Sequence, residues 1–461
     1  MKSFFKKAIL LFISIIVVIN LFAQPSLSYT PIINDSIQLL GYKNIVHAKY
    51  LKDSASASGQ NKKYIVKEYR ERYEFINSMF TEKELMASTE IDNYLTSLVN
   101  EIFKGNPELK QLGTHFHFSR VYWPNASSTG EGTIFFNMGL FSKLQNESQV
   151  VFVLCHELAH LYLDHMNKTI LQYINTMYSD EVQQELKEIK KSKYEKNKQL
   201  DKLQKALVFK DRRHGRQYES EADSVGLVFL QHTSFNVEEA LTGLVLLDEI
   251  DKEKYEPVAG LKHYFNSPEY PFQEKWVKKE VSFFGGATDA QLTGKERDSL
   301  KTHPDCKVRI ERLRPSVEKL INNHGNNFVV SEAKFTDLKE RFKFEIIEFC
   351  FISKRISRCL YYAMEFFETH PDNAWLATMI GKCWNEFYLN QKNHTLNQVV
   401  DLPSPYEDKN YNSLLQFIQK IRVDDISAIA YYFFRSYQGK FNSNEGFMQG
   451  MNKSKENFGK N

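Results

Sequence analysis

The stretch VVFVLCHELAH at residues 150–160 decides how the rest of this chain is interpreted. It is apolar on nearly every side of a helix, so we expect the helix to be buried. Asn146 followed by Gln149 three residues later is typical of a helix start. His156 and His160 are four residues apart and therefore face the same way. The sequence thus predicts a buried helix that presents two imidazoles side by side.

These residue types point to a metal-assisted hydrolase. Two imidazoles on consecutive turns can hold one Zn²⁺ ion, and Glu157, about 100° round the helix from His156, can reach a water molecule at the ion. A chance HExxH is the alternative, but two histidines and a carboxylate on a buried helix are costly without a ligand. We therefore predict a catalytic zinc site with His156 and His160 as ligands and Glu157 as the general base.

A catalytic zinc site takes three protein ligands and keeps one position open. The metzincin pattern requires a histidine at position 166, where this chain has Met166, and His165 is rotated off the ligand face. The thermolysin pattern requires a glutamate where this chain has Thr176. Both patterns are therefore rejected as the source of the third ligand.

A third candidate is the acidic segment ESEAD at residues 219–223, which is followed by Gly226. Glu219 and Asp223 are again four residues apart on an expected helix, so both carboxylates share one face. One carboxylate can bind the metal, and the other can hold a ligand histidine by its second ring nitrogen. Glu221 is expected to point elsewhere, as a surface or salt-bridge residue.

These motifs together resemble the HtpX-like zinc metallopeptidases. This gluzincin group includes the CAAX prenyl protease and the periplasmic BepA-type and mitochondrial Oma-type proteases. The family's Ile-Phe-x-Asn-x-Gly-Leu segment is matched by residues 134–140, and its Glu-x-x-x-Asp motif by Glu219 to Asp223. The resemblance covers roughly residues 115–315 and implies that Glu219 is the third zinc ligand and that Asp223 orients a ligand histidine.

A fourth matching element follows near the end of that range. His303 precedes a proline, and Arg309 precedes an isoleucine, as in the family's His-Pro-x4-Arg-Ile segment. The resemblance implies that His303 stabilises the oxyanion or binds zinc transiently, and that Arg309 supports charge at the active site.

The chain departs from the family at three places. Ser127 and Ser128 stand where relatives often have apolar residues on the substrate-binding edge strand. A charged helical stretch at 180–206 replaces apolar, membrane-associated helices, and residues 251–299 form an insertion rich in aromatic residues. The latter two departures favour a soluble, exported member.

The N-terminus has the pattern of an export signal. Three lysines precede a continuous apolar run at 8–19 that is too short to span a bilayer comfortably. An uncleaved anchor is the alternative, and no later stretch is apolar enough to span a membrane. We therefore expect a periplasmic or secreted protein.

We divide the chain into four parts: a signal peptide at 1–23, an N-terminal helical segment at 24–85, a zinc metallopeptidase domain at 86–315 and a helical C-terminal region at 316–461. The expected fold class is α+β and mostly helical, with a zincin-type domain that contains a small β-sheet. The stretch from Cys359 has tetratricopeptide-like spacing, and a plain helical bundle is the alternative.

Composition excludes other classes of protein. The 60 Lys and Arg residues nearly balance the 57 Asp and Glu residues, so nothing indicates a nucleic-acid partner. Five cysteines in 461 residues do not make a disulfide framework, although one bridge is compatible with an oxidising compartment.

The sequence therefore predicts an exported zinc metalloendopeptidase that takes one Zn²⁺ per chain. Its expected partner is a protein or peptide substrate, bound as an extended strand along the edge at 126–136. By analogy with periplasmic relatives, the C-terminal region recruits client proteins in envelope quality control. The alternative is a chaperone or scaffold for envelope proteins, with a latent or structural zinc site.

Overall fold

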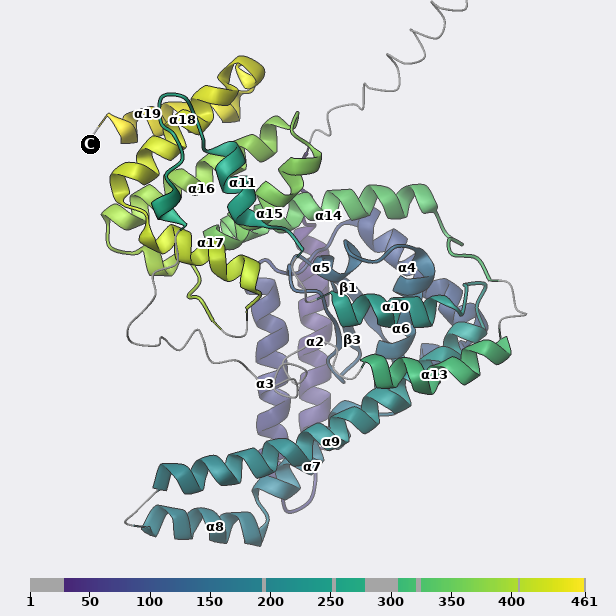
Figure 1. Ribbon diagram of the computed structural model, residues 1–461. Coiled ribbons are helices and arrows are strands. Elements are labelled where there is room, and N and C mark those ends of the chain that lie inside the picture. Colours follow the sequence, from purple (N-terminus) through teal and green to yellow (C-terminus); the bar gives the residue numbers. More distant parts are fainter. Residues whose placement is uncertain are drawn as a thin grey trace, which may run out of the picture.

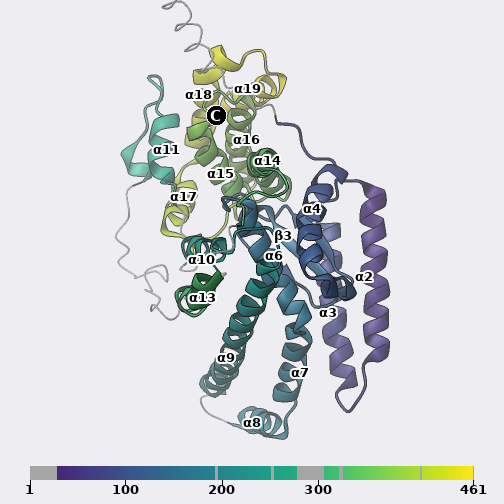
Figure 2. The same cartoon turned by 90° about the vertical axis from the view of Figure 1, so that its right-hand side faces the viewer.

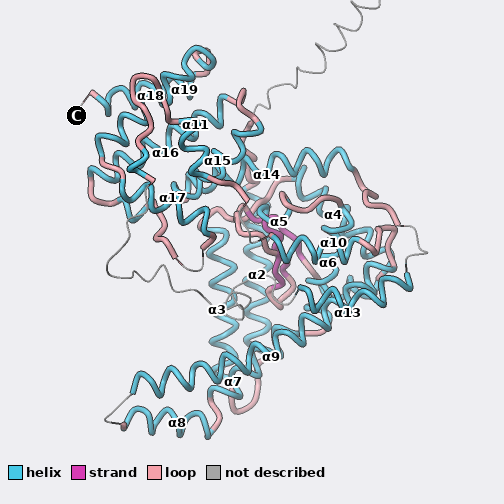
Figure 3. Tube along the Cα trace, viewed as in Figure 1, coloured by secondary structure: helices cyan, strands magenta, loops and turns pink. Residues whose placement is uncertain are grey.

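The computed structural model describes residues 29–192, 196–250, 254–277, 306–320, 325–404 and 407–459. The predicted signal peptide at 1–23 and His303 lie outside these ranges. Helices dominate the described residues, and three short strands form one sheet in their midst (Figure 3). The predicted fold class, α+β and mostly helical with a small sheet, is confirmed.

The N-terminal part is a long helical hairpin. Helices α2 (Ser36–Ser56) and α3 (Lys62–Thr81) run side by side along one flank of the molecule (Figures 1 and 2). Asp35 begins α2 as a cap, because its carboxylate accepts hydrogen bonds from the backbone N–H groups of residues 37 and 38. The residues before the hairpin reach the C-terminal region, where the backbone N–H of Ile32 donates to buried Glu345.

The sheet has the order β1-β3-β2. Strand β1 (His115–Ser119) runs parallel to β3 (Thr133–Asn137), and β2 (Ala126–Ser128) runs antiparallel to β3 on its other side. Strand β2 therefore forms an edge of the sheet among the described residues, and it contacts helix α6. The turn between β2 and β3 contains Gly130 at a φ of 81°, a conformation that favours glycine.

Helix α6 (Glu147–Tyr162) is the predicted buried helix and lies at the centre of the molecule. Asn146 caps it as predicted, accepting a hydrogen bond of 2.9 Å from the backbone N–H of Gln149. All residues from Glu147 to Ala159 are buried. Its neighbours are α4 (Thr89–Gly105), α9 (Lys196–Gln231), α10 (Glu239–Glu249), the short helix η1 (Pro107–Leu112) and, after one tight turn, α7 (His165–Met177).

The buried carboxylate of Glu147 fixes the start of α6. It accepts hydrogen bonds of 2.8 Å from the backbone N–H groups of Val329, Val330 and Ser331, and one of 2.9 Å from the hydroxyl of Tyr94. A carboxylate at a helix N-terminus also interacts favourably with the helix dipole. The segment before the C-terminal helices is thereby attached to the central helix.

The charged stretch at 180–206 is helical in its described residues, as expected, and forms an arm. Helix α8 (Asp180–Lys191) and the first part of the 36-residue helix α9 lie alongside each other at the end of the molecule away from the C-terminal region (Figure 1). The second part of α9 leaves the arm and packs against α6.

The C-terminal region is helical, as predicted. The region begins with helix α14, which packs directly against the short helix α5 (Met138–Phe141) of the central domain. Its elements are α14 (Glu332–Ile352), α15 (Ile356–Thr369), α16 (Ala374–Lys392), η4 (Leu396–Gln398), α17 (Lys409–Lys420), α18 (Val423–Phe441) and α19 (Glu445–Phe458).

The described part of the aromatic insertion belongs in space to this C-terminal region. It contains α11 (Pro257–Tyr264) and η2 (Glu274–Trp276), and α11 lies against α15 and α17 (Figure 2). The ring of Phe265 lies 5.0 Å from that of Trp384 and 5.3 Å from that of Phe433. Aromatic packing thus carries residues from within the predicted 86–315 domain into the C-terminal core, so the boundary in sequence is not a boundary in space.

All five cysteines are buried thiols, so the bridge that the sequence left open is not formed among the described residues. Across the described ranges, none of the helices combines the length and apolar character that crossing a membrane requires.

Candidate metal centre

The site is built where α9 crosses α6. Gly226 of α9 lies directly against α6, and a Cβ atom placed there would stand 3.0 Å from the backbone nitrogen of His156. Glycine therefore lets the two helix backbones approach more closely than any other residue would allow. This close contact aligns the acidic face of α9 with the histidine face of α6.

Three predicted ligands converge at this crossing. The Nε2 atoms of His156 and His160 lie 3.0 Å apart. The carboxylate of Glu219 reaches both, with Oε2 3.5 Å from Nε2 of His156 and Oε1 3.4 Å from Nε2 of His160. One ligand atom from each residue lies within 4.8 Å of the others.

This donor set fits a zinc ion. In a tetrahedral site with ligand bonds of about 2.0–2.2 Å, ligand atoms stand about 3.3–3.6 Å apart, which is close to the separations found here. Two imidazoles and one carboxylate are also a ligand set of catalytic zinc sites that keep a fourth position open. His156, His160 and Glu219 are therefore the residues that would hold the metal.

Asp223 and Arg309 contact the candidate ligands and hold them in place. Asp223 Oδ1 lies 2.9 Å from Nδ1 of His156, the ring nitrogen that faces away from the cluster. Arg309, on α13 (Cys306–Leu320), donates to both carboxylate oxygens of Asp223 at 2.6 Å. Its third nitrogen lies 3.1 Å from Oε2 of Glu219. Arg309 thus contacts two carboxylates at once and acts on the site through them.

The charges of these buried groups depend on one another. Burial disfavours a charge on His156, but its hydrogen bonds to Asp223 and Glu219 outweigh burial and raise its pKa to about 10. Burial alone would raise the pKa of Glu219, but hydrogen bonds from His156 and His160, and the charges of His156 and Arg309, hold it well below its usual range. In Asp223 burial is likewise outweighed, chiefly by Arg309, and its pKa is lowered. The buried groups of the site therefore stabilise one another's charged forms.

The remaining predicted residues are Glu157 and His303. Glu157 is buried on α6 directly after the ligand His156. His303 lies outside the described residues, so its predicted approach to the site remains a prediction.

Sequence reasoning missed one neighbour of the cluster. His165, set aside because it is rotated off the ligand face of the helix, is buried with its Nδ1 3.0 Å from Nδ1 of His160. Its Nε2 lies 3.2 Å from Oε2 of Glu221, which is partly exposed and forms this ion pair, in line with the expectation of a surface or salt-bridge residue. Burial and the neighbouring His160 lower the pKa of His165. The missed signal was Asp164, a residue type that readily adopts the left-handed turn needed to end one helix and return the chain.

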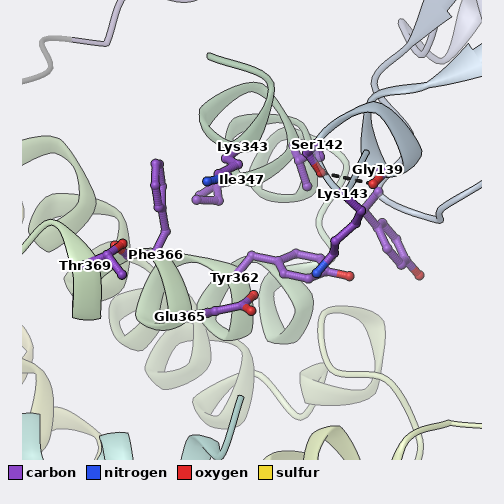
Figure 4. A pocket seen from close by; sticks show the side chains of 11 residues that line it. Gly139, Ser142, Lys143, Lys343, Ile347, Tyr362, Glu365, Phe366 and Thr369 are labelled. Atoms are coloured by element: carbon purple, nitrogen blue, oxygen red, sulfur yellow. Dashed lines mark hydrogen bonds between the residues drawn. The ribbon is translucent and has the colours of Figure 1, made fainter. Parts of the chain in front are cut away.

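A cavity elsewhere in the molecule does not compete with this site. It lies between the central domain and the C-terminal helices α14 and α15, and its lining includes Lys343, Tyr362 and Phe366 (Figure 4). None of the residues that line it belongs to the metal cluster. The cavity is thus separate from the candidate metal site, which lies at the crossing of α6 and α9.

The comparison with protein families agrees with this geometry. Residues 92–317 match the model of peptidase family M48. The matched range includes the sheet, α6, the metal-facing part of α9 and Arg309, and it excludes the N-terminal hairpin and helices α14 to α19. No curated protein matches the chain.

Proposed function

Over residues 92–317 this chain belongs to peptidase family M48, a family of metallopeptidases, and on that premise we propose that it is an exported zinc-dependent endopeptidase. The observation that carries the proposal is the convergence of His156, His160 and Glu219 on one point from two separate helices. A bound Zn²⁺ would lower the pKa of a water molecule and polarise the scissile carbonyl.

Each residue of the site has a proposed task. His156 and His160 would hold the metal through Nε2, and Glu219 would hold it through a carboxylate oxygen. The carboxylate of Glu157 takes the proton of the attacking water and then delivers it to the nitrogen of the leaving amine. Asp223, whose Oδ1 lies 2.9 Å from Nδ1 of His156, would accept the Nδ1 hydrogen and so fix the tautomer and orientation of the ring.

Two further tasks concern charge. Arg309 is a positioning residue, because its guanidinium holds Asp223 and neutralises part of the negative charge of Glu219. His303, following the family resemblance, would stabilise the negative charge that develops on the carbonyl oxygen of the substrate.

The substrate is proposed to add to the sheet at β2. This strand is an edge of the sheet among the described residues and contacts α6, the helix that carries the histidines. An extended peptide paired with Ala126–Ser128 would bind through its backbone, which gives affinity with little dependence on sequence. The half-buried side chains of Ser127 and Ser128 would then shape the preference for substrate side chains.

The predicted export signal at 1–23 and the helical C-terminal region suggest where the enzyme would act. A soluble enzyme of the cell envelope would meet misassembled proteins there, and the helical C-terminal region would recruit them. This role in protein quality control rests on analogy with periplasmic relatives of the family.

Zinc quantification paired with a Glu157→Gln variant tests the proposal. The wild-type chain is expected to bind one Zn²⁺ and to cleave casein or a peptide, with activity lost to a chelator and restored by Zn²⁺. Glu157→Gln is expected to keep zinc and lose cleavage. A variant that still cleaves would remove Glu157 from its role, and a wild-type chain that holds zinc without cleaving any substrate would favour the scaffold alternative.

A further inference from the structure

The roles above leave two residues beside the metal cluster without a task, His165 and Glu221. His165 begins α7, and Asp164 just before it has φ 55° and ψ 39°. This left-handed turn returns the chain and places Nδ1 of His165 3.0 Å from Nδ1 of His160. The imidazole of His165 stacks on the ring of Tyr218, with ring centroids 4.3 Å apart, and is almost completely buried. Its position is therefore determined by packing as well as by hydrogen bonds.

The two nitrogens of His160 face different groups. Its Nε2 faces the cluster, 3.0 Å from Nε2 of His156 and 3.4 Å from Glu219. A neutral imidazole carries one hydrogen, so a free lone pair on Nε2 requires that the hydrogen sit on Nδ1. That hydrogen can be donated only to the group that faces Nδ1, and the atom placed there is Nδ1 of His165.

His165 can accept that hydrogen only in one tautomer. Its own hydrogen must then sit on Nε2, which lies 3.2 Å from Oε2 of Glu221. Glu221 is in turn held by Gln217, whose amide donates to Oε1 at 2.8 Å. The resulting chain of hydrogen bonds has a carboxylate at its outer end, as Asp223 provides for His156. Each histidine of the cluster thus has a partner for the ring nitrogen that faces outward.

We propose that His165, held by Glu221, is a positioning residue that keeps His160 in the tautomer whose Nε2 lone pair is free for a divalent metal ion. The inference rests on the proposed function, because it assigns a task in binding the same ion. His165 does not itself bind the metal, since its Nδ1 faces the side of the His160 ring that points away from the cluster.

The direct test is the zinc affinity of the mature chain, measured by competition with a chromophoric chelator. His165→Phe keeps a ring that can stack on Tyr218 but removes both nitrogens, and it is expected to weaken zinc binding by about 10- to 100-fold. His165→Gln restores an oxygen that can accept from Nδ1 of His160, so it is expected to recover most of the affinity. The visible spectrum of the Co²⁺-loaded protein should change in the first variant and return towards wild type in the second.

Two further variants separate positioning from stability. His232→Phe removes a histidine in the turn directly after helix α9, one whose Nδ1 bonds to Oδ1 of Asn106 at 2.9 Å, and it should lower the melting temperature without changing zinc affinity. Glu221→Ala alters a side chain that is 41% exposed, so the variant should fold, and it should weaken zinc binding less than His165→Phe does.

The outcomes distinguish the two proposals. If His165→Phe binds zinc as tightly as wild type and leaves the Co²⁺ spectrum unchanged, His165 has only a packing role and the inference is overturned. The same holds if the phenylalanine and glutamine variants lose affinity equally. A wild-type chain that binds no zinc would overturn the proposed function, and this inference with it.

Discussion

Gly226→Ala is the sharpest perturbation of the helix crossing that builds the site. The added Cβ would lie 3.0 Å from the backbone nitrogen of His156, 3.1 Å from its Cα and 3.2 Å from the carbonyl carbon of Cys155. Favourable contacts between carbon atoms lie at about 3.5–4.0 Å, so α9 must withdraw from α6 by roughly 0.5 Å. Because the three contacts are backbone atoms inside a buried helix, no side chain can turn away to relieve them.

The displacement of α9 should also move the candidate metal ligand Glu219. Glu219 lies two turns before Gly226 on the same helix, and its carboxylate stands 3.5 Å from Nε2 of His156. Metal sites tolerate ligand distances within about 0.2 Å, so a shift of roughly 0.5 Å should lower zinc affinity by an order of magnitude. Overpacking costs about 1–3 kcal/mol, partly offset by about 1 kcal/mol from replacing glycine with alanine in a helix, leaving a net loss of up to about 2 kcal/mol.

Gly215→Ala is the matched control on the same helix. A Cβ at Gly215 meets nothing within 4 Å, so this variant should keep zinc affinity and gain up to about 1 kcal/mol of stability. Thermal unfolding and chelator competition measure the two quantities. If Gly226→Ala equals Gly215→Ala in melting temperature and in zinc affinity, the close helix contact does not position Glu219 and the reasoning is refuted.

Three further predictions concern other parts of the molecule. Arg309→Leu removes the guanidinium partner of buried Asp223, so thermal or chemical unfolding should show a loss of about 3–5 kcal/mol, and a near-neutral result would contradict the ion-pair account. Phe265→Ala should cost about 3–5 kcal/mol in the unfolding of the C-terminal region, provided the insertion docks there as described. Burial raises the pKa of Asp92 from its ordinary 3.8 to about 6, so the folded chain binds more protons than the unfolded chain between those values. Stability contributed by this group should therefore rise as pH falls from about 6 to about 4. Asp92→Asn should remove that dependence and raise the melting temperature at pH 7; parallel pH profiles of the two proteins would show that the carboxyl titrates normally.

The sequence alone was sufficient for features that depend on neighbouring residues. The buried helix α6 follows from an unbroken apolar run, and its start follows from an asparagine whose side chain bonds to a backbone N–H three residues later. The alignment of His156 with His160 follows from helix geometry, since residues four apart share one face. Pattern and spacing are local properties, and a chain carries them whatever its tertiary structure.

The tertiary structure alone decided which distant residues meet. The candidate ligand Glu219 reaches the histidines because Gly226 lets α9 approach α6, a contact between segments about 70 residues apart that no local pattern contains. His165 lies off the ligand face when α6 is extended as a regular helix, but one left-handed residue ends the helix and returns this side chain to His160. The aromatic insertion joins the C-terminal core for the same kind of reason: burial of apolar surface depends on the surfaces that the whole fold offers, and residue order does not specify them.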